Sequence, residues 1–515
     1  MTLLTPAGFS DASARRVWVA VGVVAAVCAT LFAWGGRDFC LDDAWIHLAY
    51  AKSLRLGDGF SYNPGDWETG SSSPLWVALL ALFPVEHAPL VIAKGLGIVW
   101  HAVGAATASS LAGVLARRWN LDAAAARGAA IVAGLLVALQ PTLLQAAVSG
   151  MEVSLTSALL LVAARLAWAD RARAWLALLV GACAVWARPE ALFFLGILCV
   201  GSLCVAPRNR AAALLLTGAV LALGGWVVYC LAVSGHAWPN TRYVKATGGD
   251  LSSLGYLAAQ VLPWQPWLAG LGGVVLVGAG SLRAVRGRQW SSLILMGAWL
   301  GTLIATALSR RLDPEVFFYL SRYFDIVAGV PAVVVALGFA CSRVGLRLTM
   351  LAPVAVVTAL QVTQLHARVR AQEEDIRLLH SQPARLIARA LPAESVVIVE
   401  GAGASRFFTP RRMRMVDMLG LNDRVLAHAH DDYARACALL RRRPTHVLVP
   451  DRYVGSMASL FGLRALEVFS DPRNTQTAAF APRRVVLAEI TRQRPEWSSR
   501  CSVDTPAIAP TLRSK

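Results

Sequence analysis

The sequence has little charge, almost no lysine and no cysteine pattern typical of a metal site. Only 16% of its 515 residues are charged, against about a quarter in ordinary soluble domains. Lysine occurs only at Lys52, Lys94, Lys245 and Lys515, so the positive charge comes mostly from arginine. The nine cysteines form neither a CxxC motif nor a Cys/His cluster, and no internal repeat is present. These absences argue against a soluble enzyme, a zinc protein and a repeat protein.

Apolar residues dominate the composition of the chain. The chain is 56% hydrophobic and its mean hydropathy is +0.54, which is typical of a polytopic membrane protein. The net charge of +18 does not indicate nucleic-acid binding, because many of the arginines lie in short loops between apolar runs. That placement is the positive-inside pattern of membrane proteins.

The apolar runs predict about eleven helical crossings of ~20 residues each. The first follows Arg15-Arg16 without a small-residue cleavage site, so we expect a retained signal anchor. The segment 74–83 is too short to cross and is expected to be re-entrant or packed against its neighbours. The expected crossings are 16–35, 88–116, 127–147, 151–169, 172–188, 190–206, 211–233, 262–282, 290–308, 324–341 and 345–365.

Loop charge predicts the orientation. If Arg15-Arg16 lies inside, the strongly basic loops between crossings, such as Arg117-Arg118, all fall on the cytoplasmic side. The unusual polar residues then collect on the opposite face. We therefore expect a multi-pass protein of a bacterial inner membrane, surrounded by membrane lipids, with its polar chemistry outside the cytoplasm.

The composition changes near residue 366, which predicts a membrane domain at 1–365 and a second domain at 366–515. Short β-branched runs at 396–399, 445–449 and 484–490 indicate a small extracytoplasmic α/β domain. Cys437 and Cys501 would be able to pair if this part is exported. The tail after Pro495 is expected to be disordered.

Asp42-Asp43 is the first polar feature on the outer face. Two adjacent carboxylates just past a membrane helix are costly unless water, a cation or a substrate meets them. One of them is expected to cap the following helix, on which positions 43, 47 and 50 share a face and bring Asp43, His47 and Tyr50 together. We expect at least one aspartate to be a catalytic base; an alternative for the pair is binding of a divalent cation.

Further outer segments carry both acids and cations. Glu152 begins a helix, and its favourable position in the helix dipole is the alternative to a functional role. Arg188-Pro189-Glu190 forms a turn, for which an internal ion pair is the alternative. Outer cations occur at Arg242, Lys245, Arg310, Arg311 and Arg322, against the positive-inside trend. They are expected to bind an anionic phosphate, with packing against the acidic loops as the alternative.

The motifs occur in an order that resembles a known family. They are Asp42-Asp43 with Tyr50-Ala51-Lys52, Gly57-x-Gly59-x-x-Tyr62-Asn63-Pro64-Gly65, Glu68-x-Gly70 with Leu75-Trp76, Ser149-Gly150-Met151-Glu152, Arg188-Pro189-Glu190, Pro239-Asn240-Thr241-x-Tyr243-x-Lys245 and Arg322-Tyr323-Phe324. This order is similar to that of the GT-C integral-membrane glycosyltransferases, in particular the branch of the mycobacterial terminal arabinofuranosyltransferases. Lys52 in place of the usual arginine, bulky Trp45 and His47, and Ser71-Ser72-Ser73 depart from the family pattern, so arabinose is not carried over.

The resemblance implies a GT-C-like fold and transfer of a sugar from a polyprenyl-phosphate donor to a glycan or glycolipid acceptor. It implies Asp42 as the base, and we expect Asp43 and His47 to assist or orient it. The expected donor-phosphate ligands are Lys52, Arg188, Arg242, Lys245 and Arg322. The expected substrate-binding residues are Tyr50, Glu68, Glu152, Glu190, Asn240, Tyr243 and Tyr323. The alternatives are a transporter or flippase for lipid-linked saccharides, with charges along a translocation path, and a non-catalytic envelope assembly protein.

Overall fold

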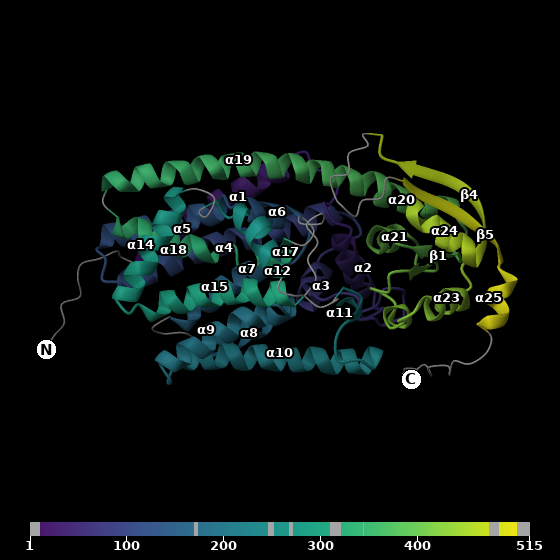
Figure 1. Cartoon of the computed structure of the whole chain (residues 1–515), viewed down its shortest axis with the longest axis horizontal. Helices are drawn as coiled ribbons and strands as arrows, with labels where there is room; N and C mark the ends of the chain where they lie inside the picture. The colour runs from purple at the N-terminus through teal and green to yellow at the C-terminus, as the bar shows by residue number, and fades with distance from the viewer. Residues whose placement is uncertain are drawn as a thin grey trace.

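A computed structural model describes residues 11–168, 174–245, 252–266, 271–309, 321–342, 344–472 and 484–501. Within these ranges the chain is mainly helical, with one five-stranded sheet near its C-terminus. Arg310 and Arg311, two of the expected outer cations, lie outside the described residues. Figure 1 shows the helices as a long bundle, and the sheet lies at one end of that bundle.

Long apolar helices form the membrane part. Five stretches are long and apolar enough to cross a membrane: Ser13–Ala33, Pro89–Arg118, Arg210–Ser234, Trp290–Leu308 and Thr349–Ala390. The first four belong to α1 (Asp11–Ala33), α4 (Pro89–Arg118), α10 (Arg210–Ser234) and α15 (Trp290–Leu308), and the last contains most of α19 (Val344–Ile376). The chain is thus a multi-pass membrane protein.

The other helices of the bundle are shorter or bent. α5 (Ala123–Ala138) and α6 (Pro141–Val148) meet at 55° and count as a sixth crossing if they form one span. Pro141 explains the break, because proline begins a new helix more readily than it continues one. The remaining bundle helices are α7 (Val153–Ala167), α8 (Ala174–Ala187), α9 (Ala191–Val205), α14 (Leu271–Arg286) and α18 (Val330–Cys341).

Several of the helices are short. The helix predicted after Asp42-Asp43 is α2 (Asp43–Arg55), and the apolar segment too short to cross is the short helix α3 (Pro74–Ala81). α3 buries Trp76, Val77 and Leu80, so it packs against its neighbours. The others are α11 (Asn240–Lys245), α12 (Ser252–Tyr256), the turns η1 (Leu257–Val261) and η2 (Leu262–Trp264), and α17 (Arg322–Asp325).

The C-terminal domain is built on a mixed sheet with the order β2-β1-β3-β5-β4. β1 (Val396–Val399), β3 (His446–Pro450) and β5 (Arg484–Gln493) were predicted; β2 (Arg414–Asp417) and β4 (Phe461–Ser470) were not. β2, β1 and β3 are parallel, whereas β5 and β4 pair in the antiparallel sense. The surrounding helices are α20 (Gln382–Ala390), α21 (Ala402–Phe408), α22 (Arg424–Ala427), α23 (Asp432–Arg441) and α24 (Asp451–Leu460).

The region after Pro495 differs from the disorder expected for it. Residues Pro495–Arg500 form α25, and Cys501 forms a disulfide bond with Cys437 of α23. The disulfide ties this segment to the domain, which explains why a polar sequence is ordered there. Residues 502–515 of the expected tail lie outside the described residues.

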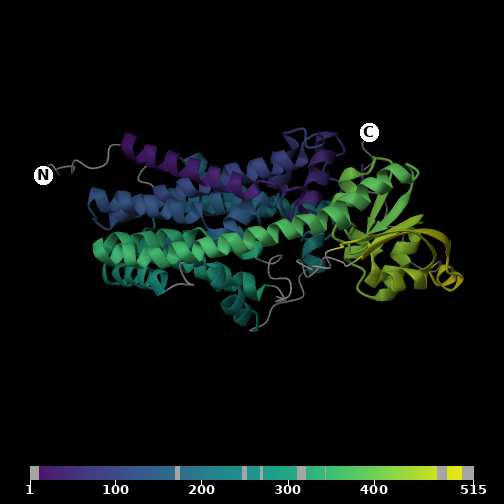
Figure 2. The ribbon, with the colours of Figure 1, turned by 90° about the horizontal axis from the view of Figure 1, so that it is seen from above.

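The two parts of the chain are joined by a helix rather than by a loop. α19 runs from the bundle to the C-terminal domain, as Figures 1 and 2 show, and continues past the predicted boundary at 365/366 through the π-helical turn η4 (Arg377–Ser381) into α20. A buried ion pair between Lys94 Nζ of α4 and Glu373 Oε1 of α19, 2.6 Å long, holds this helix on the bundle. The hydrophobic core includes residues of both parts, so the domain rests directly on the bundle end.

Candidate active site

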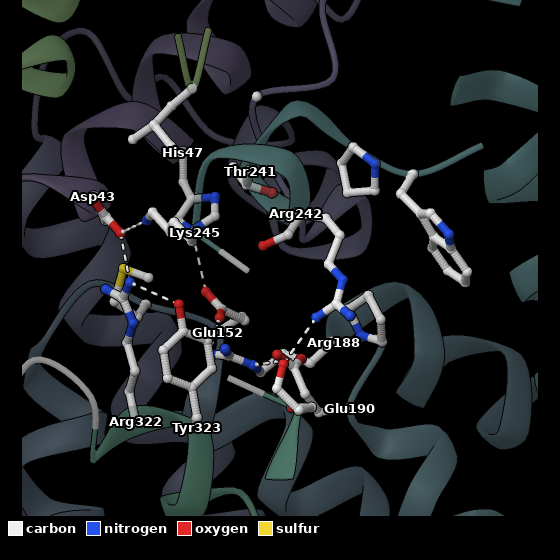
Figure 3. Close-up of a pocket in the computed structure, with 18 of the residues that line it drawn as sticks. Asp43, His47, Glu152, Arg188, Glu190, Thr241, Arg242, Lys245, Arg322 and Tyr323 are labelled. Carbon is white, nitrogen blue, oxygen red and sulfur yellow. Dashed lines mark hydrogen bonds and ion pairs between the residues drawn. The ribbon is translucent and has the colours of Figure 1, made fainter. Parts of the chain in front are cut away.

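A cavity of about 360 Å³ lies where the helical bundle meets the C-terminal domain. Its polar side chains include three carboxylates and four cations, so the lining carries a net positive charge before His47 is counted. Figure 3 shows the labelled polar residues arranged around the cavity. The lining residues are Asp43, Ile46, His47, Gly70, Ser72, Met151, Glu152, Arg188, Pro189, Glu190, Leu192, Phe193, Leu223, Trp238, Pro239, Thr241, Arg242, Lys245, Ser309, Arg322, Tyr323 and Leu421.

Asp43 lies between two cations on one side of the cavity. Its Oδ2 atom accepts hydrogen bonds from Lys245 Nζ at 3.2 Å and from Arg322 Nη2 at 2.7 Å (Figure 3). Burial by itself would raise the pKa of Asp43, but the charges of Lys245 and Arg322 outweigh it and hold that pKa well below its usual range. Asp43 is therefore ionised in this arrangement, and both cations are partly neutralised by it.

A second ion network forms another side of the cavity. His47 Nε2 lies 3.1 Å from Glu152 Oε2, and Arg188 Nη1 lies 2.6 Å from Glu152 Oε1. Arg188 also contacts Glu190, with Nε 3.4 Å from Oε2, and its guanidinium stacks 4.6 Å above the Tyr323 ring. The other nitrogen of His47, Nδ1, is 3.1 Å from Ser71 Oγ, so both ring nitrogens have partners.

Local sequence explains how these groups converge. On α2, residues three and four apart share a face, so Asp43, Ile46 and His47 all reach the cavity. Gly150 adopts a φ of 76° and lies against the Phe39 ring, where a Cβ atom would come within 2.5 Å of the ring. This tight turn leads through Met151 to Glu152, the N-cap residue of α7.

Asp42 has a different environment from its neighbour and does not line the cavity. Its Oδ2 and Oδ1 atoms accept the backbone N–H groups of Gly403 and Ala404, at 2.8 and 2.9 Å, at the start of α21. His380 Nδ1 is 3.7 Å from the same carboxylate. Asp42 also occupies the N-cap position of α2, but its side chain does not cap that helix. Its carboxylate thus joins α2 to the C-terminal domain.

The positions of the Asp42 and Asp43 carboxylates also concern the alternative of a bound divalent cation. The carboxylates of Asp42 and Asp43 face different partners, so a shared cation would require both to leave them. Among the residues that the structure describes, no three His, Cys, Asp or Glu side chains are grouped closely enough to hold a metal ion.

Of the fifteen predicted site residues, nine line the cavity and six, including Asp42, do not. Tyr50 is buried and its hydroxyl accepts the Gly70 N–H at 3.2 Å. Lys52, expected on the donor phosphate, instead donates to the Phe407 carbonyl at 2.8 Å in the C-terminal domain. Tyr243 lies against the ring of His428, with centroids 4.5 Å apart.

Glu68 and Asn240 form a buried link beside the cavity. Asn240 Nδ2 donates to Glu68 Oε2 at 2.9 Å, and Arg424 of the C-terminal domain lies 4.0 Å from Glu68 Oε1. Burial raises the pKa of Glu68 to about 8, and the nearby charge of Asp423 adds to this rise. Like Tyr50 and Lys52, these two residues hold together the segments that surround the cavity.

Several lining residues were not predicted. Leu192 and Phe193 of α9 and Leu223 of α10 give the cavity an apolar side, and Leu421 reaches it from the C-terminal domain. The three apolar residues lie inside expected crossings, where their residue types do not differ from those of lipid-facing neighbours. Leu421 lies in the segment 417–423 of the C-terminal domain, and no composition or charge signal in the sequence places this leucine at the site.

Comparisons with known proteins agree with this architecture. Residues 364–498 match a family model described as a domain of unknown function (DUF8728). No match was found among curated proteins. The structure is similar to ArnT from Cupriavidus metallidurans in the apo state, at 14% identity and a TM-score of 0.62 over 92% of this chain and 97% of that one.

Two further structures are similar at the level of the fold. ArnT from the same organism bound to undecaprenyl phosphate aligns at 14% identity and a TM-score of 0.61, over 93% of this chain and 98% of that one. The oligosaccharyltransferase of Archaeoglobus fulgidus in the apo form aligns at 12% identity and a TM-score of 0.55, over 91% and 74% of the two chains. The helical bundle and the C-terminal domain thus share the fold of these solved structures, and GT-C is the fold that the order of the motifs led us to expect.

Proposed function

We propose that the chain transfers a sugar from a polyprenyl-phosphate donor to a glycan or glycolipid acceptor outside the cytoplasm. The observation that carries the proposal is the cavity itself. It combines a carboxylate with two cations, Lys245 and Arg322, and an apolar side at the end of membrane helices. These are the groups needed to deprotonate an acceptor, hold a phosphate and accommodate a lipid.

The two parts of the proposed donor, its prenyl chain and its phosphate, bind to different sides of the cavity. The prenyl chain lies along the apolar residues Leu192, Phe193 and Leu223, and the phosphate faces the cations. Arginine and lysine donors stabilise the negative charge that grows on the phosphate as the glycosidic bond breaks. The likeness to ArnT bound to undecaprenyl phosphate supports this class of donor, although it is a likeness of fold alone.

Asp43 is the proposed base. Its carboxylate lies in the cavity, whereas the carboxylate of Asp42, to which the family resemblance assigns this role, accepts two backbone N–H groups outside the cavity. A single displacement with inversion at the sugar carbon is the expected course from the resemblance. His47 lies one helical turn from Asp43, and its contact with Glu152 holds it in position. His47 thus forms part of the cavity lining near the proposed reacting atoms.

The proposed orientation has eleven crossings in a bacterial inner membrane, with the cavity and the C-terminal domain outside the cytoplasm. Within the described residues, the five long apolar helices, the bent pair α5 and α6, and the shorter apolar helices α7, α8, α9 and α18 support a multi-pass arrangement. The disulfide bond between Cys437 and Cys501 supports an oxidising compartment for the C-terminal domain.

Transfer by the purified protein in lipid nanodiscs, measured with a set of polyprenyl-phosphate sugars, tests this function. Lys245→Ala and Arg322→Ala should each reduce kcat/KM for the donor by about 10²-fold, as for loss of one charge-stabilising donor. Lys52→Ala is the matched control, because its ammonium binds a carbonyl outside the cavity and should leave the donor KM unchanged. Absence of transfer with every donor, or equal transfer by all variants, would contradict the proposal.

A further inference from the structure

The contacts of Asp43 conflict with its role as a base. A base must offer a lone pair to the acceptor hydroxyl, yet Oδ2 of Asp43 already accepts from both Lys245 and Arg322. The Asp43 and Arg322 side chains are only 18% and 7% exposed, so this triad is shielded from solvent screening. In this state Asp43 is a weak base, because the two cations stabilise its ionised form.

A donor phosphate requires the same two cations. Its oxygens accept the charge-assisted bonds that the Asp43 carboxylate accepts here, and both cations line the cavity. They come from α11 and α17, far from Asp43 in the sequence, and both contact this carboxylate. Asp43 therefore occupies the place that the phosphate would take.

From this overlap we infer that the donor phosphate displaces the Asp43 carboxylate from Lys245 and Arg322, so that donor binding itself releases the base. The inference rests on the proposed function and adds a binding order to it. Donor binds first, and only then does Asp43 become competent to accept the proton of the acceptor.

The charges balance at each stage of this cycle. With the donor bound, the single negative charge of its phosphodiester and that of Asp43 together match the two cations. During transfer the acceptor oxygen forms a bond to the sugar carbon, the carbon–oxygen bond to the phosphate breaks, and its electron pair remains on the phosphate. The acceptor proton moves to Asp43. The phosphomonoester that leaves carries up to two negative charges, and these match the two cations while Asp43 is neutral.

The other two acids of the cavity, Glu152 and Glu190, are paired with different cations from those that bind Asp43. Glu152 is engaged by His47 and Arg188, and Glu190 contacts Arg188 at the turn between α8 and α9. When the lipid phosphate leaves, Lys245 and Arg322 return to Asp43, lower its pKa and expel the proton to solvent. The ion triad thus resets the base after each turnover.

Binding of undecaprenyl phosphate to the full-length protein in nanodiscs tests the inference. Asp43→Asn removes the competing charge and should bind the lipid about tenfold tighter than wild type, equivalent to about 1.4 kcal/mol. Asp66→Asn is the matched control, because Asp66 is an acid of the same outer segment that pairs with Arg414 outside the cavity; its affinity should equal that of wild type. Equal or weaker binding by Asp43→Asn, with intact binding and transfer by wild type, would overturn the inference alone.

Failure of the wild type to bind the lipid would instead overturn the proposed function together with the inference. A second measurement needs no variant, in case Asp43→Asn does not fold. Infrared difference spectra of the wild type should gain a protonated carboxylic acid band when undecaprenyl phosphate, a phosphomonoester, saturates the site. No such band at saturation would overturn the inference.

Discussion

Replacing Asp42 by asparagine tests whether this residue docks the C-terminal domain on α2 or acts as the catalytic base. The Asp42 carboxylate receives two hydrogen bonds from the backbone of α21 and is 14% exposed. Hydrogen bonds to charged groups contribute roughly 1.5–3 kcal/mol each. Asparagine keeps one acceptor oxygen for one of the two backbone N–H groups. Its amide NH₂ group then faces the other N–H group, so that two donors meet and one hydrogen bond is lost. We expect Asp42→Asn to weaken the contact between α2 and α21 by roughly 2–3 kcal/mol.

That loss has a measurable consequence in hydrogen exchange. It corresponds to roughly a 30- to 150-fold increase in opening of the contact. The amides of α21 should therefore exchange faster in Asp42→Asn by up to that factor, when followed by mass spectrometry of the protein in nanodiscs. Asp431→Asn is the matched control, because Asp431 caps α23 within the same domain and should leave α21 exchange unchanged.

Transfer measurements complete this test. The tight approach of α21 makes the contact sensitive, since a Cβ atom at Gly403 would lie 2.2 Å from the Asp42 carbonyl oxygen. We expect a partial loss of kcat in Asp42→Asn, because α2 also carries Asp43 and His47, whereas the affinity for undecaprenyl phosphate should persist. Complete loss of transfer with unchanged α21 exchange would refute the docking role and assign the chemistry to Asp42.

Two further predictions concern stability. The folded chain holds the Glu68 proton up to its raised pKa of about 8, whereas the unfolded chain loses it near the ordinary value of 4.5, so this group contributes less stability as pH rises through that window. Glu68→Gln should therefore show a smaller decline of Tm between pH 6 and pH 9 than wild type, and an identical decline would contradict the assignment. Cys437→Ser should lose about 4 kcal/mol of C-terminal domain stability, because the disulfide closes a 64-residue separation. Unchanged denaturant unfolding of that domain would show that the Cys437–Cys501 bond is not formed.

Segments with a strong local pattern could be predicted from the sequence. The apolar runs placed the bundle helices, and three β-branched runs placed β1, β3 and β5. β4 was not predicted because most of its residues are exposed and its sequence mixes charged with apolar residues, without the β-branched run that marked the other strands. The order at Pro495–Arg500 was missed because it depends on a disulfide bond that sequence alone leaves open.

The site was predicted in outline but not residue by residue. Adjacent residues at a helix start point in different directions, so Asp42 and Asp43 could not be distinguished by sequence even though one meets α21 and the other the cavity. Lys52 and Lys245 are equally plausible cations, and their roles depend on partners 355 and 202 residues away. Long-range contacts of this kind carry no local signal.

The most direct test of the account is a structure of the protein in nanodiscs with undecaprenyl phosphate bound. The account predicts the phosphate within hydrogen-bonding distance of Lys245 and Arg322, the lipid chain along Leu223, and the Asp43 carboxylate released from both cations. A phosphate bound elsewhere, with the ion triad of Asp43 intact, would contradict it.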